Sequence, residues 1–221
     1  MTPLSRYAKF TIDIIKMSTF SKIYAGNLYD KYHSSSPLVR FAVKGFLKKI
    51  GIALAGISVK TILDCGCADG YISNYIYSLK RPLYMAAADI SEDILRKAKR
   101  HYAYLDFLNA SIFHLPFKND SFDLVSVFET LEHLNSPEAA LKEIRRAGRR
   151  YFIFSVPMEP YWHLVNMAAG KYWARLGNTP GHISSWTKKG FLTSLIKNKF
   201  LITKDLSTFP WTMILCEKKT A

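Results

Sequence analysis

The chain has 221 residues, of which 49% are hydrophobic and 22% are charged. This length and composition fit one compact domain with a hydrophobic core, and they exclude a disordered tail, a disulfide scaffold, collagen, a coiled coil and a low-complexity segment. The formal net charge of +14 points to an acidic partner, which could be nucleic acid, an anionic membrane or a phosphorylated substrate.

The excess positive charge is carried by the two flanks of the chain. Residues 1–60 hold ten basic and two acidic side chains, residues 61–150 hold twelve of each, and residues 151–221 hold nine and three. The charge therefore bears on what the flanks approach, and it says little about the chemistry of the neutral middle part.

The cysteines and the apolar runs indicate where the protein resides. Three cysteines cannot form a closed set of disulfides, which favours a reduced, cytoplasmic protein, and Cys65 and Cys67 lack the second pair that a zinc site needs. Basic residues interrupt every apolar run before it reaches the roughly 18 to 20 residues of a membrane span, and no secretory signal is found. We expect a cytoplasmic protein that is soluble or peripheral at a membrane.

Residues 1–59 are predicted to form a helical N-terminal cap. Residues 38–50 of this cap have the spacing of an amphipathic helix. The expected apolar face holds Leu38, Phe41, Ala42, Phe46 and Ile50, and the expected basic face holds Lys44, Lys48 and Lys49. Residues 4–16 are a second amphipathic basic stretch. These two stretches predict peripheral contact with an anionic membrane.

From Thr61 onward, short apolar runs alternate with amphipathic stretches, which is the pattern of a parallel sheet covered by helices on both faces. The runs predict strands at residues 60–65, 83–88, 105–109, 122–128 and 151–156, with helices at 70–79, 91–100 and 137–147. Ser91 and Ser136 are the expected N-cap residues. Residues 60–156 are therefore predicted to form an α/β core.

The pattern changes after Pro157. Residues 157–190 contain an aromatic segment and are expected to form a lid. Residues 191–221 hold the end of a helix over 187–197 and two β-like runs, 200–206 and 211–216, which predict an antiparallel hairpin at the edge of the sheet. No repeat or long linker divides the chain, so we expect a single domain, α/β in class, with seven mostly parallel strands.

The strongest chemical signal is a strand that runs into a turn of small residues and then a helix, Ile62-Leu63-Asp64-Cys65-Gly66-Cys67-Ala68-Asp69-Gly70-Tyr71. Gly66 and Gly70 allow a tight turn with bare backbone beside a helix N-terminus. Asp64 and Asp69 would repel a pyrophosphate and favour a cation. Asp89, at the end of the next strand, can accept two ribose hydroxyls. Together these residues predict a site for an adenosine that carries positive charge.

With these motifs in this order, residues 60–156 resemble the class I S-adenosylmethionine-dependent methyltransferases, in particular the type 11 group. The block Leu115-Pro116-Phe117-Lys118-Asn119-Asp120-Ser121-Phe122-Asp123-Leu124-Val125 is similar to the family's segment before its fourth strand. The family's first motif usually reads D-x-G-x-G-x-G, so Ala68 replaces a glycine, and Ser111 stands where an adenine-binding Asp is often found. The resemblance implies a Rossmann-like fold.

The resemblance also implies S-adenosylmethionine as the cofactor and assigns residues to its parts. The methionine end of the cofactor would face Asp64, Gly66, Cys67 and Gly70, and its ribose would face Asp89. Ile90 would flank the adenine, and the Ser111 hydroxyl or the Ile112 amide would recognise it. Phe128 would lie under the cofactor.

A second cluster, Glu129-Thr130-Leu131-Glu132-His133-Leu134, directly follows the predicted fourth strand, and ligands of open α/β sheets bind at such strand ends. A histidine, with an ordinary pKa of about 6.5, suits removal of a proton from a hydroxyl acceptor, so His133 is the candidate base.

The E-x-x-E-H spacing of this cluster is similar to that of the ubiquinone-pathway O-methyltransferases and of the small-RNA 2′-O-methyltransferases, where it binds a divalent metal. The RNA enzymes add a later His, and His182 precedes Trp186-Thr187 here. The resemblance implies a Mg²⁺ site made of Glu129, Glu132, His133 and His182. The alternative is an ordinary pocket wall without metal.

The flanks supply candidate substrate residues, namely Tyr29, Tyr32, Tyr161, His163 and His182. Tyr29 and Tyr32 would fold over the cofactor or pack a helix on the core. The aromatic residues after the fifth strand would stack on a flat acceptor, lie in a membrane interface or form a plain hydrophobic lid.

Three functions follow from these features. The first is methylation of an oxygen of a small-molecule or lipid-like acceptor. The second is 2′-O-methylation of RNA, which the basic flanks favour but which no RNA-binding motif supports. The third is a non-catalytic basic binding protein on the same fold. The charge distribution places anionic lipid or a phosphorylated small molecule ahead of RNA, and the oligomeric state stays open.

Overall fold

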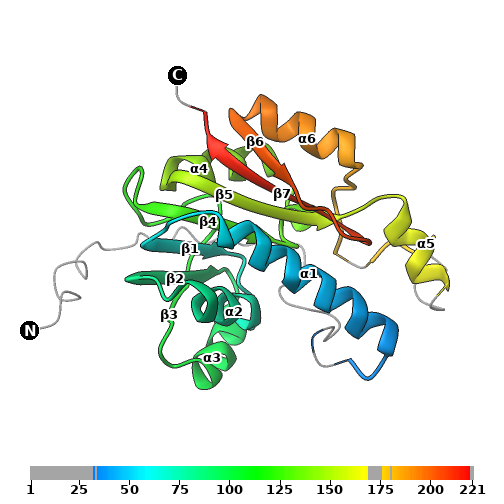
Figure 1. Ribbon diagram of the computed structural model, residues 1–221, viewed down its shortest axis with the longest axis horizontal. Coiled ribbons are helices and arrows are strands. Elements are labelled where there is room, and N and C mark those ends of the chain that lie inside the picture. Colours follow the sequence, from blue (N-terminus) through cyan, green and yellow to red (C-terminus); the bar gives the residue numbers. More distant parts are fainter. Residues whose placement is uncertain (1–31, 33, 169–175, 180, 220–221) are drawn as a thin grey trace, which may run out of the picture.

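The computed structural model describes residues 32, 34–168, 176–179 and 181–219 (Figure 1). Tyr29 and the amphipathic stretch 4–16 lie outside the described residues, so the predictions made for them stay predictions. Within the described part of the chain, no helix is both long and apolar enough to cross a membrane.

Seven strands form one sheet in the order β3-β2-β1-β4-β5-β7-β6 (Figure 1). They are β1 Thr61–Cys65, β2 Tyr84–Asp89, β3 Asp106–Asn109, β4 Phe122–Phe128, β5 Gly148–Pro157, β6 Phe200–Asp205 and β7 Trp211–Lys218. The first five are parallel, and β7 runs antiparallel to both β5 and β6. The predicted seven-stranded, Rossmann-like sheet with a C-terminal hairpin is confirmed.

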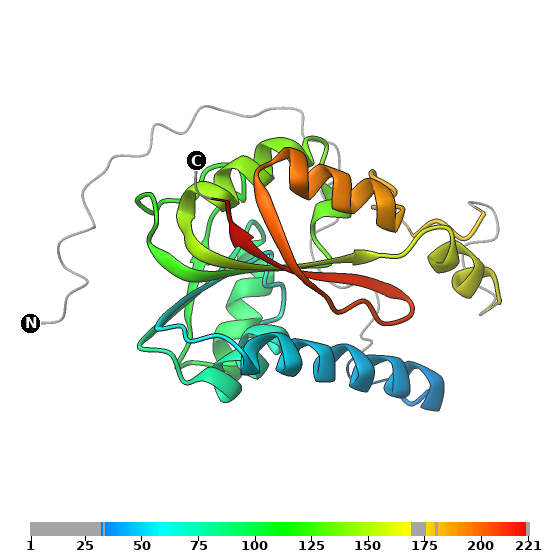
Figure 2. The ribbon, with the colours of Figure 1, turned by 45° about the horizontal axis from the view of Figure 1, so that its top comes forward.

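The helices cover both faces of this sheet (Figure 2). They are α1 Pro37–Ala55, α2 Tyr71–Lys80, α3 Glu92–His101, α4 Pro137–Ala147, α5 Tyr161–Ala168 and α6 Lys188–Lys197. One buried cluster joins α1 and α2 to the sheet through Phe46, Ile50 and Ile76, and another joins α4 and α6 to its other face through Ile144 and Phe191.

The predicted inner face of α1 is only partly correct. Phe46 and Ile50 are buried as expected, but Leu38 and Phe41 are exposed. Gly45 already lies against Thr208, in the connection between β6 and β7. At 3.6 residues per turn, Phe41 lies on the side of α1 opposite to Ile50, so the predicted apolar residues do not all share the face that packs on the sheet.

Candidate functional site

The turn between β1 and α2 brings backbone close to neighbouring elements. Gly66 and Gly70 both adopt positive φ angles, 74° and 79°, that suit glycine. A Cβ on Gly66 would collide with the Thr130 side chain after β4, and one on Gly70 would lie 2.8 Å from the ring of Phe107. Ala68 also adopts a positive φ, 48°, at the position where the resembling family has glycine. The turn thus needs small residues at these positions.

Asp64 lies under this turn and is fully enclosed by protein. Its carboxyl group accepts hydrogen bonds from the hydroxyls of Ser73 on α2, at 2.5 Å, and Ser126 on β4, at 2.7 Å. Burial raises the pKa of Asp64 from 3.8 to about 6, although the two hydroxyls act in the opposite direction. Near neutral pH, a nearby cation would favour its charged form.

Asp89 ends β2 and ties two backbone segments together. Its Oδ2 accepts from the N–H of Ala68 in the first turn, and its Oδ1 accepts from the N–H of Ser91, both at 2.9 Å. A carboxylate offers about four lone-pair positions, so Asp89 retains acceptor sites for ribose hydroxyls.

The residues expected around adenine lie just beyond β2 and β3. Ile90 is half exposed, which suits an apolar residue that flanks a ligand. Asn109 donates to the carbonyl oxygens of Asp89 and Ile90 and fixes the backbone between them. The Ser111 hydroxyl accepts from the N–H of Phe113 at 3.3 Å, and Ile112 packs into the core.

Phe128 and Tyr32 join the N-terminal cap to the site. Phe128, at the end of β4, is buried, and its ring centroid lies 5.8 Å from that of Phe46 on α1. Tyr32 stacks on Tyr71, the first residue of α2, with centroids 4.3 Å apart. Tyr32 therefore contacts the helix that follows Gly70, and the predicted cap over the cofactor stays a prediction.

Three of the four predicted metal ligands come together after β4. Among the described residues, ligand atoms of Glu132, His133 and His182 all lie within 4.8 Å of one another. Glu129 is held elsewhere, because its Oε1 accepts from Ser155 Oγ at 3.2 Å and its Oε2 from Trp211 Nε1 at 2.7 Å. Two imidazoles and one carboxylate suit Mn²⁺ or Zn²⁺ better than the oxygen-preferring Mg²⁺.

His133 has a defined orientation. Its Nδ1 lies 2.9 Å from the carbonyl oxygen of Gly181, and its ring centroid lies 5.0 Å from that of His182. A carbonyl oxygen can only accept, so the neutral ring carries its proton on Nδ1, and Nε2 is the basic nitrogen.

The lid residues do not converge on one point. Tyr161 is exposed and packs against Phe209, with ring centroids 6.2 Å apart. His163 Nε2 lies 3.1 Å from Oε1 of the buried Glu159, and burial raises the pKa of that carboxyl while His163 opposes the rise. Trp162 connects the lid to the cluster after β4, because its ring lies 6.4 Å from that of His182.

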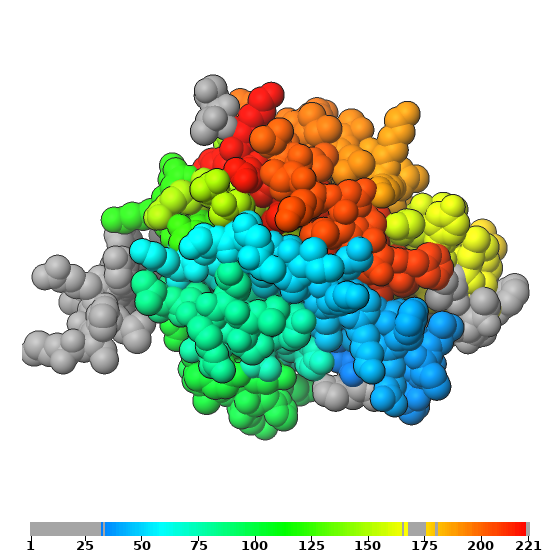
Figure 3. Space-filling model, viewed as in Figure 1, coloured from blue at the N-terminus to red at the C-terminus, as the bar shows by residue number. Residues whose placement is uncertain are grey.

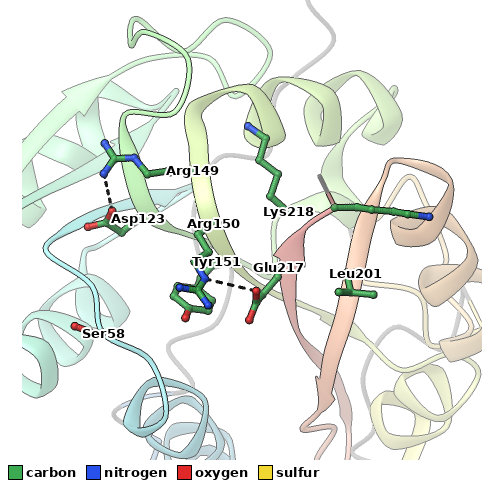
Figure 4. A pocket seen from close by; sticks show the side chains of 9 residues that line it. Ser58, Asp123, Arg149, Arg150, Tyr151, Leu201, Glu217 and Lys218 are labelled. Atoms are coloured by element: carbon green, nitrogen blue, oxygen red, sulfur yellow. Dashed lines mark hydrogen bonds and ion pairs between the residues drawn. The ribbon is translucent and has the colours of Figure 1, made fainter. Parts of the chain in front are cut away.

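The opposite edge of the sheet, where β4 and β5 begin, holds a hollow of about 610 Å³ (Figure 4). Arg149 pairs with Asp123 at 3.1 Å, and Arg150 pairs with Glu217 at 3.5 Å. Asp123 also accepts from the N–H groups of Lys60 and Thr61. These pairs hold β1, β4, β5 and β7 together, and none of the predicted site residues lies in this hollow.

Sequence reasoning missed several residues that position the candidate site: Ser73, Asn109, Ser126, Ser155 and Trp211. Ser126 had a signal, since it is a polar residue inside a strand that is otherwise apolar at buried positions. Trp211 had none, because its contact with Glu129 joins residues that are 82 positions apart.

Comparison with known proteins identifies the central part of the chain. Residues 63–152 match the family described as a methyltransferase domain. An uncharacterized protein of Methanocaldococcus jannaschii is 36% identical over 112 residues, which cover 49% of this chain and 46% of that protein. A ubiquinone biosynthesis O-methyltransferase of Xanthomonas euvesicatoria pv. vesicatoria is 26% identical over 172 residues, which cover 72% and 70% of the two chains.

Among solved structures, magnesium protoporphyrin IX methyltransferase from Synechocystis PCC 6803, with bound SAH, superposes with a TM-score of 0.62. It is 17% identical, and the match covers 84% of this chain and 89% of that one. This likeness shows a shared fold. The chain spans about half the length of the first curated relative that it matches.

Proposed function

We propose that this chain, whose residues 63–152 match the methyltransferase domain family, is a class I S-adenosylmethionine-dependent methyltransferase of the type 11 group that methylates an oxygen of a small-molecule or lipid-like acceptor. The observation that carries this proposal is the orientation of His133. Its Nδ1 faces the Gly181 carbonyl, which leaves Nε2 free to accept a proton from a hydroxyl at the carboxyl end of β4.

The residues on the other side of the site fit the cofactor. When bound, S-adenosylmethionine supplies the methyl group. The turn at Gly66 and Gly70 leaves room for its methionine end, and Asp64 offers a charge opposite in sign to the ammonium and sulfonium groups. Asp89 would accept hydrogen bonds from the ribose hydroxyls, and the buried Phe128 would form an apolar floor.

The base role of His133 depends on a helix-like turn over Leu131–His133 that follows β4. The carbonyl oxygen of Glu132 in this turn accepts from the N–H groups of Ile183 and Ser184, at 2.9 and 3.0 Å. The turn therefore accepts hydrogen bonds from the segment that carries His182 and, through His133 Nδ1, donates one to it. These bonds hold the His133 ring in the site.

Methyl transfer to a panel of hydroxyl-bearing acceptors tests the proposal. We expect His133→Gln to lower turnover by about 10²- to 10⁴-fold, the usual contribution of a general base, while cofactor affinity stays unchanged. His101→Gln, at an exposed histidine that ends α3 and has no place in the proposed site, is the matched control. Equal turnover in His133→Gln and wild type would contradict the base role, and no transfer to any acceptor would contradict the proposed activity.

A metal-assisted variant of this function is the second candidate, because Glu132, His133 and His182 share one small space. Such an ion would be held by these three side chains and would polarise the acceptor oxygen. Calorimetric titration of Mn²⁺, Zn²⁺ and Mg²⁺ into the protein with cofactor and acceptor present tests it. We expect Mn²⁺ or Zn²⁺ to bind and His182→Ala to lose that binding. The absence of binding by every ion would refute the metal.

A further inference from the structure

Five large apolar side chains are exposed around one end of the molecule, beyond the carboxyl ends of the parallel strands. Leu38 and Phe41 on α1 are 75% and 77% exposed, Phe209 before β7 is 58% exposed, and Tyr161 and Leu164 on α5 are 51% and 54% exposed. Isolated exposed apolar residues need no explanation, but a contiguous group on a protein surface marks a place of contact.

Contacts show that the three segments are neighbours. A Cβ on Gly45 of α1 would lie 3.3 Å from Thr208 Oγ1, and Phe209 packs against Tyr161 of α5. Beneath them, Phe46 of α1 lies 5.0 Å from Trp211, measured between ring centroids. In Figure 3 the blue end of α1, the orange-red start of β7 and the yellow α5 adjoin one another on one face.

The same surface is positively charged. Phe41, Lys44, Lys48 and Ile52 recur every three or four residues along α1 and are exposed, so they form one outward stripe, with Arg40 beside it. Residues 32–60 contain five basic side chains and no Asp or Glu. Residues 161–168 and 206–213 contain no acidic side chain either. No carboxylate of these segments offsets the charge.

We propose that this surface, formed by Leu38, Phe41, Tyr161, Leu164 and Phe209 with Arg40, Lys44 and Lys48, docks on an anionic lipid bilayer. Aromatic and aliphatic side chains beside Lys and Arg are the composition of helices that lie in a bilayer interface. Lysine, in contrast, is depleted from protein–protein interfaces. The absence of acidic residues matches the negative surface of such a bilayer.

The docking surface borders the proposed site. Trp162, on the same short helix as Tyr161, lies 5.9 Å from Trp211 and 6.4 Å from His182, again between ring centroids. Docking would therefore place the entrance to the site at the lipid–water boundary, where an amphiphilic acceptor dissolved in the bilayer could reach it. This consequence for the acceptor rests on the proposed function, whereas membrane binding itself does not.

Co-sedimentation of the full chain with vesicles tests the proposal. Vesicles of phosphatidylcholine mixed with phosphatidylserine should pellet the protein, vesicles of phosphatidylcholine alone should pellet much less, and high salt should weaken the binding. Leu38→Ser with Phe41→Ser should lower the partition coefficient about tenfold or more for each side chain. Lys44→Gln with Lys48→Gln should lower it about fivefold per lysine.

Matched controls lie on other parts of the surface. Leu83→Ser changes an exposed leucine before β2, and Lys97→Gln with Lys99→Gln changes two exposed lysines on α3. We expect both controls to bind vesicles like wild type. The proposal is overturned if wild type does not bind anionic vesicles, if it binds neutral vesicles equally well, or if the controls lose as much binding as the surface variants.

Two further measurements distinguish membrane docking from dimer formation and from the proposed methyl transfer. Light scattering after gel filtration should give the same mass for wild type and Leu38→Ser/Phe41→Ser. A dimer that this variant dissociates would show that the surface joins two copies, which would overturn membrane docking. Cofactor titration of every variant checks the fold, and the vesicle assay contains no cofactor or acceptor. A failure of membrane binding is therefore distinct from a failure of methyl transfer.

Discussion

The carboxyl group of Asp64 is buried in β1, directly beneath the turn between β1 and α2. Its pKa of about 6 in the ligand-free fold lies well above 3.8, so near neutral pH the fold holds a buried charge that costs stability. At 1.36 kcal/mol per pH unit, this difference corresponds to about 3 kcal/mol. Ser73 and Ser126 reduce the cost without removing it. If Asp64 faces the cofactor as proposed, this stability is given up for ligand binding.

Replacement of Asp64 by Asn should reveal this cost. Between pH 3.8 and 6 the folded state holds a proton that the unfolded state releases, so the Asp64 contribution to stability rises as pH falls through 6. At pH 7, Asp64→Asn should raise the free energy of unfolding by up to about 3 kcal/mol. Urea unfolding of both proteins from pH 4 to 8 measures it, and a difference independent of pH would contradict the assignment.

The same carboxyl group should make cofactor binding depend on pH. A cationic ligand favours ionised Asp64, so binding releases a proton below pH 6, and affinity should fall by up to about tenfold per pH unit there. Calorimetric titration with S-adenosylmethionine in buffers of different ionisation enthalpy measures the released proton. In Asp64→Asn, affinity should be lower at pH 7 and this part of the pH dependence absent.

Gly66 shows how one missing methyl group keeps the turn open. In Gly66→Ala the new Cβ would collide with Thr130, and a positive φ would add about 1–2 kcal/mol of backbone strain. We expect a loss of stability of about 2 kcal/mol or more and loss of measurable cofactor binding. Gly51→Ala is the control, since its Cβ would be in ordinary contact with Tyr75. Thermal unfolding and cofactor titration decide the outcome.

At the scale of elements, α1 secures the cap through one aromatic residue. Phe46 is buried against Phe128 and Trp211, with ring centroids 5.8 and 5.0 Å away. Phe46→Ala should lower the free energy of unfolding by about 3–5 kcal/mol and weaken cofactor affinity, because Phe128 loses its support. Phe41→Ala, on the exposed part of the same helix, should change stability by less than about 0.5 kcal/mol. Similar effects of the two would contradict this packing.

The sequence predicted the elements well where local signals were strong. Periodicity located all seven strands, and the residues before and inside the helices marked their starts, because Ser91 and Ser136 lie in the N-cap positions of α3 and α4. The prediction was wrong for Leu38 and Phe41, which are exposed, because at 3.6 residues per turn they lie away from the face that Phe46 and Ile50 bury. The insertion of β7 between β5 and β6 likewise depends on tertiary packing.

The candidate site likewise contains residues that local sequence signals predicted and residues that they could not. Asp89 and the glycines of the first turn follow two successive strands of the chain, so the spacing of the motifs was enough to predict that they lie together. The cluster of Glu132 and His133 with His182 joins residues about 50 positions apart, and only the resemblance to known methyltransferases suggested it. Glu129 matched the same motif, yet its carboxylate is held by Ser155 and Trp211, which a spacing rule does not see.

At the scale of the whole molecule, the C-terminal hairpin is part of the core. β7 pairs with β5 over Tyr151–Pro157 and Trp211–Glu217, and its side chains belong to the buried clusters on both faces of the sheet. Without the hairpin, β5 would be an exposed edge strand with buried residues on both faces. Residues 60–156 therefore do not have a complete core of their own, and the chain should unfold as one unit.

Two optical probes can test this prediction, because they report on different parts of the chain. All four tryptophans lie between residues 162 and 211, so fluorescence follows the C-terminal third, whereas far-ultraviolet circular dichroism follows the helices throughout. In urea the two curves should coincide with one midpoint. A chain that ends at residue 199, without β6 and β7, should show no cooperative transition by either probe. Separate midpoints, or a folded truncated chain, would mean that residues 60–156 are stable without the hairpin.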